Sequence, residues 1–163
     1  MPGGGGLMMV TMEEVADQLR QHEIIRSHMR FLIALLSNLT GQSGQPTAQV
    51  STLNERISLY RWSLYDFQEA VSCHMETDEH IFGTVCDGVT LEILMREHEE
   101  IKKQMDSIVS LAQNAIYLKL RRKELNKCAS DIVEGANKTC ELLSVHMAKE
   151  ERILMNISAT APS

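Results

Sequence analysis

The chain has 163 residues, of which 44% are hydrophobic, and this is enough for one globular domain with a sizeable core. Its formal net charge of −6 argues against nucleic acid as a partner. The sequence has no apolar stretch of transmembrane length, no secretory signal and four widely spaced cysteines, so we expect a cytoplasmic protein with reduced thiols and no membrane partner, either a monomer or a homodimer.

Strand signals are almost absent and strong helix formers dominate, which predicts an all-α protein. The first helix is predicted to begin at Thr11, where Thr11 and Glu14 match a capping box, and to end near Leu39. The segment 41–48, G-Q-S-G-Q-P-T-A, contains the strongest cluster of helix breakers and is predicted to be a loop.

The second helix is predicted to begin at another capping box, formed by Thr52 and Glu55, and to end near Phe82. The segment 83–89, G-T-V-C-D-G-V, contains two glycines and is predicted to be the second loop.

The third helix is predicted to begin at Thr90. The loop after it is weakly marked, and we place it between residues 116 and 122, with the fourth helix continuing to about Asn156. Four long helices with short loops predict an up-down-up-down antiparallel four-helix bundle. The expected boundaries are a flexible N-terminal tail at residues 1–10, the bundle at residues 11–157 and a C-terminal tail at residues 158–163.

One sequence pattern occurs in both the second and the fourth predicted helix. The segments C-H-M-E-T-D-E-H-I-F and V-H-M-A-K-E-E-R-I-L align without a gap, which places His74 over His146 and Asp78 over Glu150. In each copy a carboxylate follows a histidine by four residues, a turn of about 400° on a helix, so both side chains lie on one face. Each copy can therefore supply two ligands to a metal ion.

A second repeat relates the first and third predicted helices. R-Q-H-E-I-I-R-S-H-M aligns with R-E-H-E-E-I-K-K-Q-M and places His22 over His98, so the chain is predicted to be a duplicated helical hairpin. The midpoint between His22 and His74 is residue 48, and that between His98 and His146 is residue 122. Both midpoints lie in or beside predicted loops, so we expect all four histidines at one depth in the bundle.

These patterns predict a metal site of four imidazoles and two carboxylates: His22, His74, Asp78, His98, His146 and Glu150. Nitrogen and oxygen donors without thiolate favour iron, then manganese, over zinc. Two irons bridged by carboxylates would be close enough to bind oxygen, peroxide or nitric oxide between or beside them.

Two ligand positions have alternatives. His28 is about 240° around the helix from His22, and the stripe before it is more polar, so we prefer His22. Glu79 competes with Asp78 as the carboxylate of the second helix. Glu79 and its counterpart Glu151 point about 140° away from their histidines, so we expect them at solvent or as outer partners of the ligands.

This arrangement resembles the hemerythrin-like (HHE cation-binding) domains over residues 11–156. The run E-H-E-E-I-K around His98 and the run H-M-A-K-E-E-R-I-L from His146 are the most typical. The resemblance implies a non-haem di-iron centre with an oxo or hydroxo bridge. It also implies that the four histidines are terminal ligands and that Asp78 and Glu150 bridge the irons.

The chain departs from oxygen-carrying hemerythrins at two positions. Lys102 stands where they have a further histidine, and Asp78 is shorter than the usual glutamate. We therefore expect a protein that binds or senses oxygen, nitric oxide or iron. The alternatives are a di-iron enzyme that consumes peroxide or activates oxygen, and a metal-free or mononuclear helical interaction module.

Overall fold

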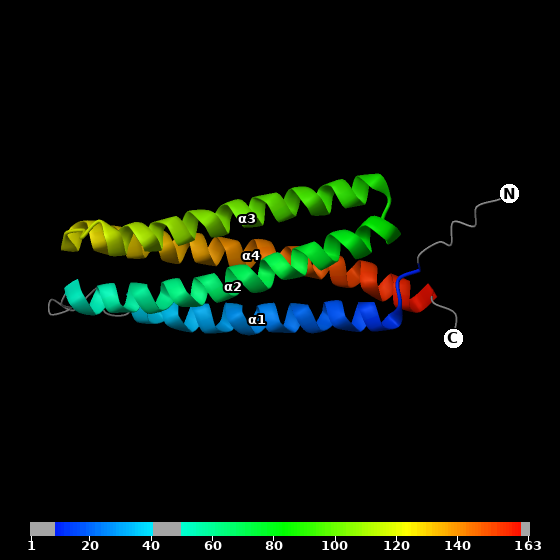
Figure 1. The fold of residues 1–163 in the computed structure, drawn as a ribbon, viewed down its shortest axis with the longest axis horizontal. Coiled ribbons are helices and arrows are strands. Elements are labelled where there is room, and N and C mark those ends of the chain that lie inside the picture. Colours follow the sequence, from blue (N-terminus) through cyan, green and yellow to red (C-terminus); the bar gives the residue numbers. More distant parts are fainter. Residues whose placement is uncertain (1–8, 41–49, 161–163) are drawn as a thin grey trace.

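The computed structural model describes residues 9–40 and 50–160, and these residues form four helices and no strand. The helices are α1 (Met12–Thr40), α2 (Val50–Val85), α3 (Gly88–Tyr117) and α4 (Arg122–Thr160). They lie side by side along one long axis (Figure 1). Among the described residues each helix packs mainly on two neighbours, and α1 does not contact α3. This arrangement confirms the predicted antiparallel four-helix bundle.

The start of α1 confirms the first predicted capping box. The backbone N–H of Thr11 donates to Glu14 Oε2 at 2.7 Å, and the backbone N–H of Glu14 donates to Thr11 Oγ1 at 3.1 Å. These bonds satisfy two backbone donors that have no partner within the helix. The predicted loop 41–48 lies outside the described residues.

The prediction of a loop over residues 83–89 is wrong in length. The helix α2 continues through Gly83, and only Cys86 and Asp87 separate it from α3. A single glycine costs a helix only about 1 kcal/mol, so packing of the surrounding turns overrides it. Asp87 is the residue that ends the turn, because its side chain accepts from the Thr90 N–H at 2.7 Å and caps α3.

Two other helix ends differ from the predictions. The helix α2 begins two residues before Thr52, so the predicted capping box is not at its start. The helix α4 runs to Thr160, beyond the predicted end at Asn156 and into the predicted C-terminal tail. The α3–α4 turn, residues 118–121, falls within the predicted range. Residues 1–8 and 161–163 of the predicted tails lie outside the described residues.

The interior contains two apolar clusters with a buried polar layer between them. The larger cluster extends toward the α3–α4 turn and includes Ile57, Leu64, Phe67, Ile108 and Leu143. The smaller cluster lies at the end where α1 begins and α4 ends, and its buried members are Val15, Ile81, Phe82, Leu94 and Leu154. The polar layer between them lies about 15 Å along the bundle from the start of α1.

One close helix contact depends on a glycine. A Cβ atom on Gly135 of α4 would lie 3.1 Å from Ile108 Cγ1 of α3, so the missing side chain allows the two helices to approach. This contact belongs to the larger cluster.

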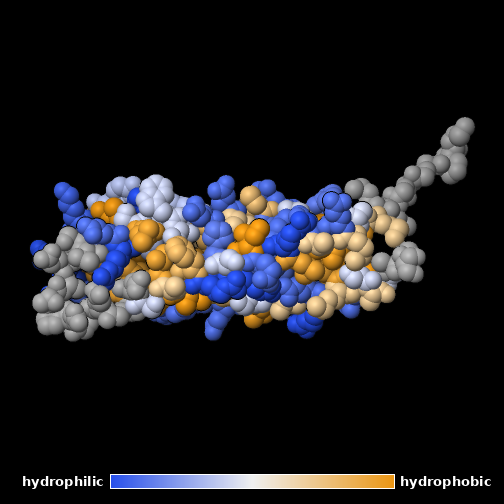
Figure 2. Space-filling model, turned by 90° about the horizontal axis from the view of Figure 1, so that it is seen from below, coloured by the Kyte–Doolittle hydropathy of each residue, from blue (hydrophilic) through white to orange (hydrophobic). Residues whose placement is uncertain are grey.

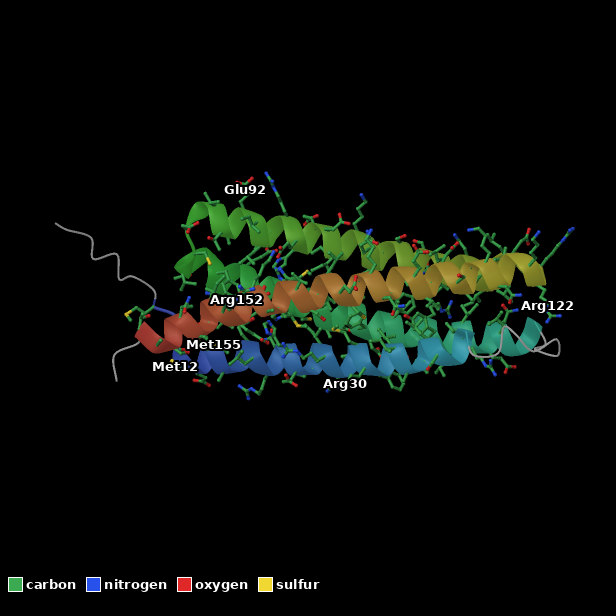
Figure 3. The ribbon with its side chains drawn as sticks, turned by 180° about the vertical axis from the view of Figure 1, so that it is seen from behind. Met12, Arg30, Glu92, Arg122, Arg152 and Met155 are labelled. Atoms are coloured by element: carbon green, nitrogen blue, oxygen red, sulfur yellow. The ribbon has the colours of Figure 1, made fainter. Side chains whose placement is uncertain are left out.

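The exterior is polar with separate hydrophobic areas. Figure 2 shows hydrophilic and hydrophobic areas alternating along one face, and Ile24, Phe31 and Ile33 of α1 are among the exposed hydrophobic residues. Figure 3 shows the side chains of Arg30 and Glu92 pointing away from the bundle. None of the four described helices combines the length and the apolar character needed to span a membrane.

Candidate metal centre

Each helix contributes one histidine to the buried polar layer, and α2 and α4 each add a carboxylate one turn further on. The helix periodicity explains this, because the histidines lie on the same stripes as the core residues of their helices. The structure brings together all six residues that the sequence analysis selected, each no more than 2% exposed: His22, His74, Asp78, His98, His146 and Glu150.

The first group of donors joins α1, α2 and α4. His22 Nε2 lies 3.1 Å from His74 Nε2 and 2.9 Å from Glu150 Oε2, and His74 Nε2 lies 3.3 Å from the same oxygen. His74, His22 and Glu150 thus direct three donor atoms toward one point.

The second group joins α2, α3 and α4. His98 Nε2 lies 2.9 Å from His146 Nε2, which in turn lies 2.7 Å from Glu150 Oε1. Asp78 Oδ2 lies 3.6 Å from His98 Nε2 and 3.0 Å from His74 Nε2, so this oxygen stands between the two groups. The second group therefore has four candidate donors.

The spacing of these atoms fits metal coordination better than hydrogen bonding. Two nitrogens bound at right angles to one ion, each about 2.1 Å away, are about 3 Å apart, as in both histidine pairs. Asp78 Oδ2 and Glu150 Oε1 lie within ion-pair distance of histidine nitrogens, yet neither oxygen has a hydrogen-bond donor of acceptable geometry. Short distances without hydrogen-bond geometry arise when the lone pairs of neighbouring donor atoms point toward a common third atom, as they do around a metal ion.

The two groups are related by the sequence repeat. The rings of His22 and His74 are 4.7 Å apart at 79°, and those of His98 and His146 are 4.7 Å apart at 71°. Glu150 belongs to both groups, with one carboxylate oxygen in each. A bridging carboxylate between two neighbouring metal positions has this geometry.

The outward-facing nitrogen of each histidine also has a partner. His22 Nδ1 lies 3.0 Å from Glu151 Oε1, and His98 Nδ1 lies 3.4 Å from Glu79 Oε1, so these two glutamates are outer partners as expected. The other two partners were not predicted from the sequence. His74 Nδ1 donates to Gln21 Oε1 at 2.9 Å.

The remaining outer partner is Glu97, whose Oε2 accepts from His146 Nδ1 at 2.7 Å. Glu97 also pairs with Lys149. The repeat could have identified Gln21 and Glu97, because each immediately precedes a ligand histidine at equivalent positions. With Nδ1 bound to these partners, every Nε2 is free to face inward and bind a metal.

The buried carboxylates strongly influence the histidines. Burial lowers the pKa of His74, but the carboxylates of Asp78 and Glu150, 3.0 Å and 3.3 Å from its Nε2, outweigh burial and raise that pKa to about 9. The same causes raise the pKa of His98 to about 9. Burial also raises the pKa of Asp78. The pKa of Glu150 is lowered because the four histidines around its carboxylate outweigh its burial.

The donor set therefore fits cationic metal ions. Asp78 and Glu150 are fully buried, and among the described residues Lys149 and Arg26 pair with the outer glutamates Glu97 and Glu151. Buried carboxylates without a compensating charge are strongly destabilising. Protonated histidines can supply this charge in the metal-free protein, and metal ions can supply it in the metal-loaded protein.

The alternative ligands lie elsewhere. His28 is half-buried and stacks near Phe67, with ring centroids 6.3 Å apart. Glu79 is half-exposed and faces the outer nitrogen of His98. Lys102 is partly exposed and pairs with Glu99 at 3.4 Å, so it does not replace the nitrogen ligand of oxygen-carrying hemerythrins.

The chain matches no family model, no curated protein and no solved structure. The resemblance to hemerythrin-like domains therefore depends on the residues of this chain alone.

Replacing Glu97 by glutamine should weaken metal binding by about 10- to 100-fold, because Glu97 orients His146 and increases its basicity. Competition with a chromophoric chelator for iron(II) under nitrogen would measure the affinity. Glu100→Gln is the matched control, since Glu100 is an exposed glutamate of α3 that accepts a hydrogen bond from Gln104 and contacts no candidate ligand among the described residues. Equal affinities for both variants would contradict an outer role for Glu97.

Proposed function

We propose that this chain is a non-haem di-iron protein of hemerythrin-like type that binds or senses oxygen, nitric oxide or iron. The observation that carries the proposal is that Glu150 is shared by two buried donor groups, with one oxygen directed to each histidine pair. Two ions joined by a carboxylate satisfy this geometry, whereas a single ion would leave one histidine pair without a role.

The choice of iron follows from the chemistry of the donors. The set contains imidazoles and carboxylates but no thiolate, since no cysteine belongs to either candidate donor group. Such donors suit iron and manganese, whereas structural zinc prefers a closed site with four ligands. We propose two iron ions with an oxo or hydroxo bridge, His22, His74, His98 and His146 as terminal ligands, and Asp78 and Glu150 as bridges.

One observation favours an enzyme as the second candidate. Because Lys102 pairs with Glu99 outside the site, the His98–His146 position lacks a third nitrogen ligand. A metal with open coordination positions can react with peroxide or activate oxygen as well as bind a ligand reversibly.

Metal analysis of protein produced in iron-replete cells tests the proposal. We expect about two irons per chain and a near-ultraviolet absorption band from the bridged pair. Less than one metal ion per chain after purification without chelators would contradict it and favour an interaction module. Manganese or zinc in place of iron would retain the site but change its chemistry.

Turnover distinguishes the two iron-dependent functions. Sustained peroxide consumption by the wild type, abolished in His146→Ala and not reproduced by free iron, would favour the enzyme. A stable adduct with oxygen or nitric oxide without turnover would favour binding or sensing.

A further inference from the structure

Gln18 has a buried polar side chain but is not one of the candidate metal ligands. It lies on α1 four residues before His22, so the two residues share one helical face and are one turn apart. Gln18 is fully buried, and neither its amide nitrogen nor its amide oxygen has a hydrogen-bond partner among the described residues. A buried amide without partners destabilises a fold, so a specific cause is needed for keeping it.

The helix register places Gln18 on the carboxylate side of the centre. Moving from His22 to Gln18 leads toward the start of α1, and moving from a histidine to its carboxylate on α2 or α4 leads toward the same end of the bundle (Figure 1). Both oxygens of Asp78 and Oε1 of Glu150 also lack hydrogen-bond donors. Polar atoms without partners therefore occur together at this level of the interior.

The two halves of the molecule differ at this position. The repeat that aligns His22 with His98 aligns Gln18 with Leu94, a member of the smaller apolar cluster. Gln18 also lies beside the histidine group with three candidate donors, whereas the Leu94 half has four. The unpartnered amide thus stands beside the smaller of the two candidate donor groups.

The surroundings of Gln18 limit what it can contact. The smaller apolar cluster closes the interior on the side away from the histidines, with Val15 on α1 itself and Phe82 and Leu154 on the neighbouring helices. In such surroundings a single hydrogen bond is stronger than in water.

We propose that the Gln18 carboxamide donates a hydrogen bond to a small ligand that binds at the metal centre beside His22 and His74. The ligand class is a water molecule, a small anion or an oxygen species that has a lone pair next to the metal. This inference rests on the proposed function, since without metal ions no such ligand would be held there.

Azide titration of the iron-loaded protein tests this role, with azide as the probe and its charge-transfer absorption as the signal. Gln18→Leu should still bind about two irons but should bind azide at least about tenfold more weakly, the effect of losing one hydrogen bond. In the metal-free protein the same substitution should raise the melting temperature by several degrees, because it removes an unpartnered amide.

Leu94→Met is the matched control, because it changes the apolar residue at the repeat-related position and should leave azide affinity within about twofold. If Gln18→Leu fails to fold, Gln18→Met is measured against the same limits. A variant with full iron content and azide affinity within about twofold of wild type would overturn the role of Gln18 and leave the di-iron proposal standing. A wild-type protein that binds no iron would overturn both. A lower melting temperature of the metal-free Gln18 variant would instead indicate a structural role and also overturn the inference.

Discussion

Glu150→Gln is expected to reduce the metal content from about two ions per chain to less than one. Glu150 is the only residue that belongs to both donor groups, with Oε2 2.9 Å from His22 Nε2 and Oε1 2.7 Å from His146 Nε2. An amide removes the negative charge and turns one coordinating oxygen into an NH₂ group that faces histidine nitrogens. We expect metal affinity to fall by at least about 100-fold, measured as metal per chain after gel filtration.

The control is Glu134→Gln, the same chemical change at an exposed position of the same helix. Circular dichroism of both variants would separate lost metal binding from lost folding. Glu150→Asp keeps the charge on a shorter side chain and should retain part of the metal. Full metal content in folded Glu150→Gln protein would show that Glu150 does not bridge.

Removing the metal should make stability depend on pH between about 6.5 and 9. In the metal-free fold the pKa values of His74 and His98 are raised from 6.5 to about 9, because the neighbouring carboxylates of Asp78 and Glu150 outweigh burial. A histidine whose pKa is higher in the folded state stabilises the fold fully below pH 6.5, and this contribution is lost as the pH rises through 9. Each histidine should account for on the order of 3 kcal/mol, and both together for less than twice that, since they share the same carboxylates.

The metal-loaded protein should not show this decline, because its histidines are neutral and bound to ions whatever the pH in this range. Urea unfolding of the metal-free and metal-loaded protein at several pH values would measure the difference. Metal uptake near neutral pH should also release protons, which a weakly buffered solution with a pH indicator would detect. Parallel stability curves for the two forms would contradict this view of the centre.

The two halves of the candidate centre are not equivalent. The repeat relates Gln21 to Glu97, so a neutral amide supports His74 where a carboxylate supports His146. It also relates Asp78 to Glu150, but Asp78 faces both histidine pairs with one oxygen, whereas Glu150 directs a different oxygen to each pair. If two irons bind, they should differ in the basicity of their histidines, and spectroscopy should resolve two iron environments.

Much of the fold and of the candidate site could be predicted because the helical periodicity of the sequence shows which residues share one face of a helix. The four-residue spacing from His74 to Asp78 and from His146 to Glu150 is a property of helices that holds before any tertiary contact forms. The predicted loop at residues 83–89 is too long, because a glycine does not by itself end a helix. Packing along α2 and α3 outweighs the free-energy cost of a glycine within the helix.

The sequence by itself determined which residues face the interior and at which depth, because helical periodicity and distance from the turns depend only on position along the chain. Only the tertiary structure decided how those residues meet. It brought His22, and not His28, into a buried candidate donor group with Glu150, and it placed Gln21 and Glu97 on the outer nitrogens. It also left the Gln18 amide buried without a partner. These outcomes depend on the rotation of each helix and the rotamer of each side chain, which are set only when α1, α2, α3 and α4 pack together.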